Sequence, residues 1–157
     1  RNEAATAGLD IADERPDAVD GEGADTLSGG AAHDTLTGGE GNDRLSGNAG
    51  KDALSGGGGK DILDGGRGRD VLTGGDDRDI FVFTKGSGND RITDLGTGQD
   101  TILLDEDLWS GKLTVRKVIN KFGEIDGDDL LLDFGIDSLR IDNVDDRFEV
   151  TGFFGFA

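Results

Sequence analysis

Large apolar residues recur at every ninth position between residues 20 and 82, among residues that are mostly glycine, aspartate, serine and threonine. Each of them has a small, polar or β-branched residue on both sides. One apolar position between outward-facing neighbours is typical of a short strand with a single side chain turned inward. The pattern therefore predicts seven three-residue strands, centred on Leu27, Leu36, Leu45, Leu54, Leu63, Leu72 and Phe81.

Glycine separates these strands. Of the 29 glycines in the chain, 18 lie within residues 20–82, mostly at the first, second and fourth places of a nine-residue unit such as Gly38 to Ser46. Glycine lacks the β-carbon that penalises positive φ, so this run predicts a tight loop of about six residues. Seven units follow one another without a gap, starting at Asp20, Gly29, Gly38, Gly47, Gly56, Gly65 and Gly74.

Two consecutive units predict one flattened coil of 18 residues, with a loop at each end. Units one, three, five and seven would then stack their loops along one edge, and units two, four and six along the other. The fold class expected from this pattern is all-β, a parallel β-roll in the manner of a β-helix-like solenoid, with a β-rich cap at its C-terminal end.

An aspartate occupies the sixth place of every unit. Strand spacing sets stacked aspartates about 5 Å apart along an edge, where two carboxylates repel by about 3 kcal/mol at an effective dielectric of about 20. One leucine in nine residues does not offset this repulsion and the cost of ordering so many glycines. We therefore expect a fold that requires a cation between the stacked aspartates, which are Asp25, Asp34, Asp43, Asp52, Asp61, Asp70 and Asp79.

The ligand types indicate which cation. Carboxylates and loop carbonyls are hard oxygen donors. The chain has one histidine and no cysteine, so it offers few of the nitrogen and sulfur ligands that zinc, copper and iron prefer. A flexible glycine loop suits the six to eight ligands of calcium better than the strict octahedron of magnesium. Calcium is the expected ion, and His33, at a fifth place, is expected to be an exposed bystander.

Charge and length exclude several classes of partner. The formal charge of −18 divides as −3, −7 and −8 over residues 1–19, 20–82 and 83–157. An acidic chain disfavours nucleic acid and anionic lipid, which both need clustered Lys and Arg. No run of 18 apolar residues is present, so no transmembrane segment is expected. No thiol nucleophile, H-E-x-x-H zinc motif or G-x-S-x-G elbow occurs, so this stretch is not expected to be an enzyme.

The unit closely resembles the repeat-in-toxin (RTX, hemolysin-type) nonapeptide G-G-x-G-x-D-x-U-x, where U is a large aliphatic residue. The resemblance implies a parallel β-roll that binds calcium between like loops, through sixth-place aspartates and loop carbonyls, in a bacterial protein exported by type I secretion. It implies about five sites in the block: Asp25 with Asp43, Asp34 with Asp52, Asp43 with Asp61, Asp52 with Asp70, and Asp61 with Asp79. It also implies the secretion machinery as a partner and an extracellular location.

The motif is not uniform. Asp20 and Asn48 replace glycines at the first and second places, and Ala32 and Asp77 replace the fourth-place glycine. The loops of units two and seven are thus the least typical. The firmest sites are expected in the middle of the block, from Asp43 to Asp70.

Both flanks differ from the repeats. Residues 1–19 are expected to be a linker, in which a short strand near Leu9 to Ala12 is one way to cap the first repeat. Residues 83–157 begin with two looser copies that place Asp90 and Asp100 at the sixth place. These aspartates either add one or two calcium sites or belong to short capping strands, and the sequence leaves both open.

The rest of the C-terminal flank carries the bulky side chains. All eight Phe and Trp109 lie at or beyond residue 81, which predicts a hydrophobic C-terminal cap with strands at Lys112–Ile119, Leu130–Phe134 and Ser138–Asn143. Outward apolar residues in the later units (Ile62, Val71 and Ile80) suggest that this flank folds back over that face. The end, Phe148–Ala157, is similar to uncleaved C-terminal export signals, and a final strand is the alternative reading.

Three functions fit this sequence. The first is a calcium-triggered folding and secretion module at the C-terminus of a larger exported protein; the chain opens with Arg1, which suggests a fragment. The second is a polysaccharide-binding or adhesin module. A row of fifth-place cations would favour it, namely Lys51, Lys60, Arg69 and Arg78. The third is the tail of a secreted protease, lipase, alginate epimerase or toxin.

Overall fold

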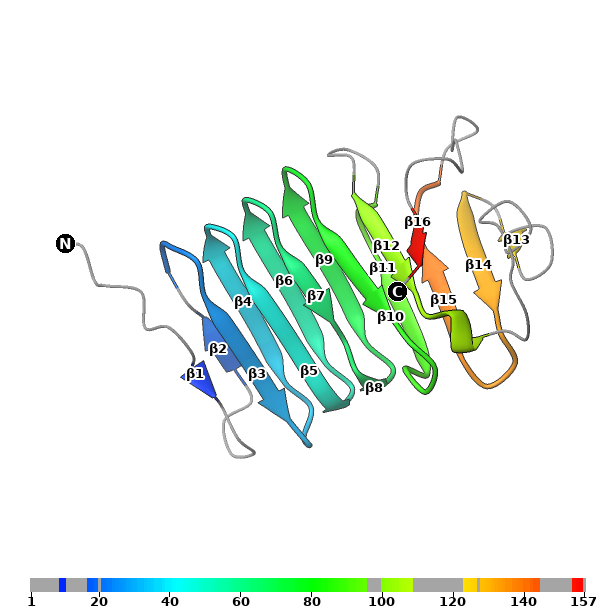
Figure 1. Cartoon of the computed structure of the whole chain (residues 1–157), viewed down its shortest axis with the longest axis horizontal. Coiled ribbons are helices and arrows are strands. Elements are labelled where there is room, and N and C mark those ends of the chain that lie inside the picture. Colours follow the sequence, from blue (N-terminus) through cyan, green and yellow to red (C-terminus); the bar gives the residue numbers. More distant parts are fainter. Residues whose placement is uncertain are drawn as a thin grey trace.

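The computed structural model describes residues 9–10, 17–19, 21–95, 100–108, 123–126, 128–144 and 154–156. Its elements are short strands and one 3₁₀ turn (Figure 1). They are β1 (Leu9–Asp10), β2 (Asp17–Val19), β3 (Thr26–Gly30), β4 (Thr35–Glu40), β5 (Arg44–Gly50), β6 (Ala53–Gly58), β7 (Ile62–Asp64), β8 (Arg67–Gly68), β9 (Val71–Asp76), β10 (Ile80–Phe83), β11 (Asn89–Ile92), β12 (Thr101–Leu104), η1 (Glu106–Leu108), β13 (Gly123–Asp126), β14 (Asp129–Asp133), β15 (Ser138–Ile141) and β16 (Phe154–Phe156).

Alternate strands pair in parallel and form two facing sheets. One sheet runs β1-β3-β5-β7-β10-β12-β16, with β8 paired to β5, and the other runs β13-β14-β15-β11-β9-β6-β4-β2. Within the repeats the register is one coil of 18 residues, so that Leu27 faces Leu45 and Leu36 faces Leu54. The parallel β-roll expected from the sequence is confirmed.

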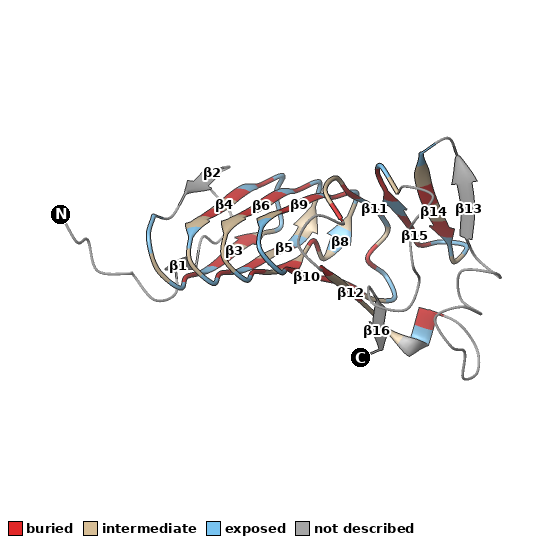
Figure 2. Cartoon of the chain, turned by 90° about the horizontal axis from the view of Figure 1, so that it is seen from above, coloured by how far each residue is buried: buried red, intermediate tan, exposed pale blue. Residues whose placement is uncertain are grey.

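The core is the column of eighth-place residues between the two sheets. Leu27, Leu45, Leu63 and Phe81 stack on one sheet, and each is fully buried. Figure 2 shows buried positions alternating with exposed or half-buried ones along repeat strands such as β4 and β9. A strand buried on one face only requires this alternation, which is why one leucine per unit suffices for a continuous core.

Strands β3, β4, β5, β6 and β9 are longer than the predicted three residues, because the first residues of the next unit also pair with their neighbours. In β4 and β6, for example, Gly39 lies opposite Gly57. Strand β7 has the predicted three residues. Positive φ occurs at second and fourth places, as at Gly39 (109°) and Gly41 (138°). First-place glycines are required for space instead, since a β-carbon on Gly56 would lie 2.2 Å from Asp61 Oδ2.

The atypical units keep the roll. Asn48 and Asp77 adopt φ of 72° and 75°, so they take the left-handed conformation of the glycines they replace. Asn and Asp tolerate this region better than other non-glycine residues. The strand at Leu9–Asp10 is also confirmed, because β1 pairs with β3. The reading of residues 1–19 as a linker missed β2, which pairs with β4.

The C-terminal flank extends both sheets in line with the repeats. Strands β12 and β16 continue one sheet, and β15 joins β11 in the other before the antiparallel strands β14 and β13. The predicted strands at 130–134 and 138–143 are thus confirmed within a residue or two. Trp109 and Lys112–Ile119 lie outside the described residues.

The expectation that the flank folds back over the outward apolar residues is wrong for Val71 within the described residues, and it stays a prediction for Ile62 and Ile80, which are half-buried on the other sheet. Val71 keeps 39% of its surface exposed. It lies in register with Arg91, and Arg91 with Arg140, so the flank continues this face by adding strands beside it. Val71 thus belongs to an open surface near the junction between repeats and flank.

Candidate metal sites

The sixth-place aspartates form two ladders, one at each edge of the roll. We call the loops at residues 21–25, 38–43, 56–61 and 74–79 the first edge, and those at 29–34, 47–52, 65–70 and 84–90 the second edge. The backbone N–H of each ladder aspartate donates to Oδ1 of the aspartate one coil further on, over 2.8 to 3.0 Å. The first edge joins Asp25, Asp43, Asp61, Asp79 and Asp100, and the second edge joins Asp34, Asp52, Asp70 and Asp90.

Asp90 and Asp100 therefore continue the ladders across the change of phase. Asp90 accepts from Asp70 at a separation of 20 residues, and Asp100 accepts from Asp79 at a separation of 21. The structure brings every candidate site residue into one of the two ladders.

The first aspartate of each ladder, Asp25 or Asp34, accepts none of these bonds, whereas Oδ1 of every later ladder aspartate accepts one backbone N–H. Oδ2 of Asp52, Asp61 and Asp70 has no hydrogen-bond partner among the described residues, and each side chain is at most 2% exposed. The same holds for Oδ2 of Asp34, Asp79 and Asp90. A buried charged oxygen without a partner costs folding free energy, so a cation bound beside these oxygens would stabilise the fold.

Backbone carbonyls lie next to these oxygens. The point where a β-carbon of Gly56 would stand is 2.2 Å from Asp61 Oδ2 and 2.6 Å from the carbonyl oxygen of Gly74. On the second edge, the corresponding point at Gly47 is 2.6 Å from Asp52 Oδ2 and 2.5 Å from the Gly65 carbonyl oxygen. A carboxylate oxygen and a carbonyl oxygen are thus held close together beside Gly29, Gly38, Gly47 and Gly56.

Loop carbonyls also point along the roll from one coil to the next. The Gly41 carbonyl oxygen would be 1.9 Å from a β-carbon on Gly59, and the Gly50 oxygen 1.7 Å from one on Gly68. Each edge therefore combines stacked carboxylates with stacked carbonyls, an all-oxygen donor set that suits calcium.

The raised pKa values of the ladder aspartates also favour a bound cation. Burial raises the pKa of Asp61 and Asp70 to about 6, of Asp79 to about 7 and of Asp90 to about 8. The N–H donated by the preceding ladder aspartate lowers each pKa, and the stacked carboxylates raise it further. Without a cation, the ladder thus favours the protonated form of these groups.

The side chains alone do not complete a metal site. Within the described ranges, no three histidine, aspartate or glutamate side chains come together in a way that could hold a metal ion. A cation between two ladder aspartates would therefore take its remaining ligands from backbone carbonyls, or from water. Six to eight mixed oxygen ligands of this kind fit calcium and do not fit zinc.

Two aspartates that the sequence did not single out close the edges. Asp94 accepts from the N–H groups of Gly74 and Gly75 over 2.9 and 2.8 Å. Asp137, in the turn between β14 and β15, accepts from Gly88 and Gly86 over 2.9 and 3.0 Å. Aspartate is common in turns, where its side chain bonds to the local backbone, so nothing in the sequence distinguished these two residues from other aspartates.

His33 is exposed, as expected. Its Nδ1 accepts the backbone N–H of Lys51 over 2.8 Å, so it links two coils of the second edge. Asn42 makes the same contact with Lys60 on the first edge. The fifth-place cations do not form one row, because Lys51 and Arg69 lie on the second edge and Lys60 and Arg78 on the first.

The comparison with protein families agrees with this geometry. The model of the RTX calcium-binding nonapeptide repeat, which spans four copies, matches residues 19–54 and again residues 55–92. The repeat block belongs to the RTX family. RTX nonapeptide repeats bind calcium, and the regular aspartate ladder of this chain fits that activity.

The RTX roll also resembles a solved structure. The extracellular lipase LipA from Serratia marcescens shares 16% identity with this chain and superimposes with a TM-score of 0.56. The match covers 83% of this chain and 38% of the lipase chain, and at this identity it shows the fold alone.

A search of curated proteins finds no match. Among the described residues, no helix is long and apolar enough to cross a membrane.

Proposed function

We propose that this chain is a calcium-dependent folding module, disordered without calcium and folded when calcium binds after export. The observation that carries the proposal is the set of buried Oδ2 atoms, such as those of Asp52, Asp61 and Asp70, that have no donor among the described residues. Binding free energy then becomes folding free energy, because the unfolded chain has no formed site.

We propose that the ions lie between successive ladder aspartates. Within the seven units the pairs are Asp25 with Asp43, Asp34 with Asp52, Asp43 with Asp61, Asp52 with Asp70, and Asp61 with Asp79. The continued hydrogen-bond ladders favour two further pairs, Asp70 with Asp90 and Asp79 with Asp100. The affinity is that of extracellular calcium modules, with Kd of about 10⁻⁴ to 10⁻³ M.

The proposed setting is the C-terminal part of a larger bacterial protein exported by type I secretion. Residues 20–82 would be the repeat domain, residues 83–157 the cap with the export signal, and residues 1–19 the connection to the parent. The parent's activity, whether protease, lipase, epimerase or toxin, would reside in its other domains. The secreted character typical of RTX proteins supports an extracellular location.

Far-UV circular dichroism during a calcium titration of chelated protein tests the proposal. We expect a disordered spectrum in excess chelator and a cooperative gain of β signal as calcium approaches millimolar concentration. A complete β signal in excess chelator would overturn the proposal, as would an unchanged disordered spectrum at saturating calcium.

A further inference from the structure

The exposed charge of the roll differs between its two edges. Lys51, Arg67, Arg69 and Lys85 are exposed on the second edge. Every acidic residue within the second-edge loops is a ladder aspartate, and each is at most 4% exposed. In a chain of net charge −18, these loops present only cations to solvent.

The first edge is different. Its loops expose Lys60 and Arg78, and they also expose four acidic residues, Glu22, Glu40, Asp76 and Asp77. The two edges come from the same nine-residue unit, so the repeat itself does not explain the contrast. The difference lies mainly at the variable third place, where Arg67 occupies the position that Glu22, Glu40 and Asp76 hold on the first edge, and at the fourth place that Asp77 occupies.

The cations of the second edge are not held in ion pairs by the described residues. Arg91 and Arg140 form ion pairs with Asp142 and Asp129. Lys51, Arg67, Arg69 and Lys85 take part in none of these. Their charge is thus available to a ligand.

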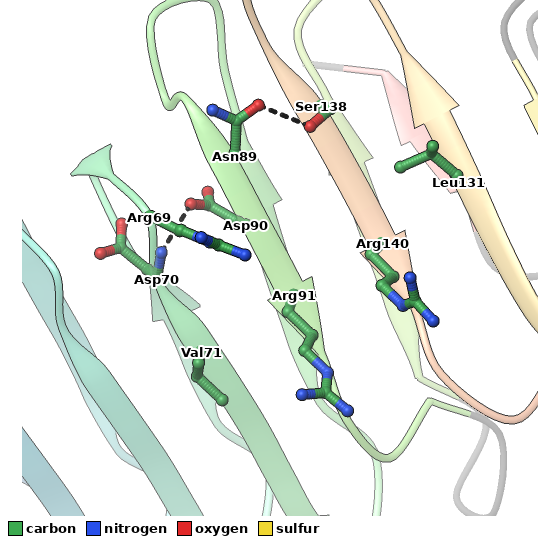
Figure 3. A pocket seen from close by; sticks show the side chains of 9 residues that line it. All are labelled: Arg69, Asp70, Val71, Asn89, Asp90, Arg91, Leu131, Ser138 and Arg140. Atoms are coloured by element: carbon green, nitrogen blue, oxygen red, sulfur yellow. Dashed lines mark hydrogen bonds between the residues drawn. The ribbon is translucent and has the colours of Figure 1, made fainter.

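A cavity of about 450 Å³ lies where the second edge meets the flank, and its lining includes Arg69, Arg91 and Arg140 together with the ladder aspartates Asp70 and Asp90 (Figure 3). Its floor is a cross-strand row, since Val71 pairs with Arg91, Arg91 with Arg140, and Arg140 with Leu131. Asp142 accepts from Arg91 Nε over 2.7 Å and orients that guanidinium. The row offers two ordered guanidinium groups between two apolar side chains.

We propose that the second edge and this cavity bind a linear acidic polysaccharide, a sugar chain that carries a carboxylate or a sulfate ester along its length. Lys51 and Arg69 stand one coil apart, about 5 Å along the roll, and would pair with oxyanions of neighbouring sugars. Arg91 and Arg140 would hold a further oxyanion in the cavity, where guanidinium forks bind carboxylate and sulfate in a bidentate manner. Val71 and Leu131 supply apolar contacts for ring faces.

A nucleic acid fits this surface less well. Duplex DNA carries one charge per about 1.7 Å, and the rest of this chain is strongly acidic. The exposed residues of the second-edge loops include no Phe, Tyr or Trp on which bases would stack. A sugar chain with about one charge per residue meets less repulsion.

The surface also depends on the calcium sites beneath it. Asp52 and Asp70 follow Lys51 and Arg69 directly in the chain and are buried, so their negative charges reduce the positive potential of this surface. Calcium between these carboxylates would cancel their charge. The inference thus rests on the folded state described under Proposed function and adds a ligand to it.

The test measures binding of end-labelled sugar oligomers to the full chain in saturating calcium, by fluorescence anisotropy. Short galacturonate oligomers present carboxylates, dextran sulfate oligomers present sulfates, and neutral dextran is the control. The variant Lys51→Gln/Arg69→Gln removes two second-edge cations. Lys60→Gln/Arg78→Gln removes the same two types of charge from the fifth places of the first edge.

We expect the second-edge variant to bind either acidic oligomer at least about tenfold more weakly, as for the loss of two charge-assisted contacts. The first-edge variant should stay within about twofold of the unmodified chain. Comparison of the two acidic oligomers identifies the preferred oxyanion. Circular dichroism of the same samples shows whether each protein is folded, which separates loss of binding from failure of the calcium-dependent fold.

Four results would overturn the inference. The first is equal weakening in the two variants, which would indicate general screening. The second is binding of neutral dextran as tight as that of the acidic oligomers. The third is tighter binding of an oligodeoxythymidine of equal charge, which would make the second edge a nucleic-acid surface. An absence of binding by folded protein at millimolar oligomer would equally contradict it.

Discussion

The backbone N–H of Asp43 donates a hydrogen bond to Oδ1 of Asp61, one coil further along the roll, over 2.8 Å. This contact fixes one carboxylate oxygen of Asp61 and leaves Oδ2 without a partner among the described residues. The aspartate thus has two separable roles, a structural acceptor on one oxygen and a candidate cation ligand on the other.

Asp61→Asn separates these two roles, because asparagine keeps an acceptor for the Asp43 N–H and loses the charge. We expect the calcium midpoint of folding to rise about tenfold, which corresponds to about 1.4 kcal/mol of lost binding free energy. Circular dichroism against free calcium measures it. The matched control is Asp77→Asn, which removes an exposed charge from the same edge. Equal midpoints for the two variants would exclude Asp61 as a ligand.

Gly41→Ala tests the close stacking of loops. Gly41 has φ of 138°, and a β-carbon there would stand 1.7 Å from the carbonyl oxygen of Gly23. The loops of units one and three would have to separate, so we expect a higher calcium midpoint and a smaller β signal at saturation. Gly21→Ala is the control, since a β-carbon at Gly21 meets nothing within 4 Å. Similar behaviour of both alanine variants would contradict the observed stacking.

Leu63→Ala tests the single-column core. Leu63 is fully buried between the two sheets. Truncation of a buried leucine typically costs about 2–5 kcal/mol. Urea unfolding at saturating calcium measures this loss of stability. Val71→Ala, on the outer face with 39% exposure, should cost less than about 1 kcal/mol. A cost for Leu63→Ala as small as that for Val71→Ala would mean that the column does not hold the roll together.

The raised pKa values predict that acid partly replaces calcium. The ordinary aspartate pKa of 3.8 rises in the folded chain to about 6 at Asp61 and about 7 at Asp79. Such groups favour folding while protonated, and this contribution is lost as pH rises from about 4 through the folded pKa values.

Calcium-free protein should therefore show more β signal at pH 4.5 than at pH 7.5. Protons also compete with calcium for the same oxygens, so the calcium midpoint should rise as pH falls below about 7. Circular dichroism of dialysed protein across this range checks both effects. A calcium midpoint independent of pH between 5 and 8 would contradict the assignment of these buried aspartates.

Much of the roll was predictable from local pattern. Leucine and aspartate recur at fixed places of a nine-residue unit, and this predicted the coil length, the alternation of edges and the aspartates that stack. A uniform repeat allows only one register in which the strands of neighbouring coils pair leucine with leucine. The sequence alone did not establish that Asn48 and Asp77 could adopt the backbone conformation of the glycines they replace. Their positive φ shows that they do.

The junction with the flank was not predictable, because it depends on contacts between residues far apart in the chain. Asp137 reaches Gly88 across 49 residues, and Arg91 reaches Asp142 across 51. No periodicity links such positions. The surroundings of Val71 were wrongly predicted for the same reason, because among the described residues the flank adds strands beside Val71 and does not cover it. The fifth-place cations were read as one row because their distribution over two edges follows only from the coil.

The ladder hydrogen bonds offer the most direct test of the central claim, that the fold requires calcium between the aspartates. Amide NMR of the chain follows the N–H groups of Asp25, Asp34, Asp43, Asp52, Asp61, Asp70 and Asp79, each of which donates to the next carboxylate. In excess chelator these amides should be unprotected from exchange and lie in the narrow shift range of a disordered chain. With calcium they should become dispersed and slowly exchanging together. Dispersed, protected aspartate amides in excess chelator would contradict the account.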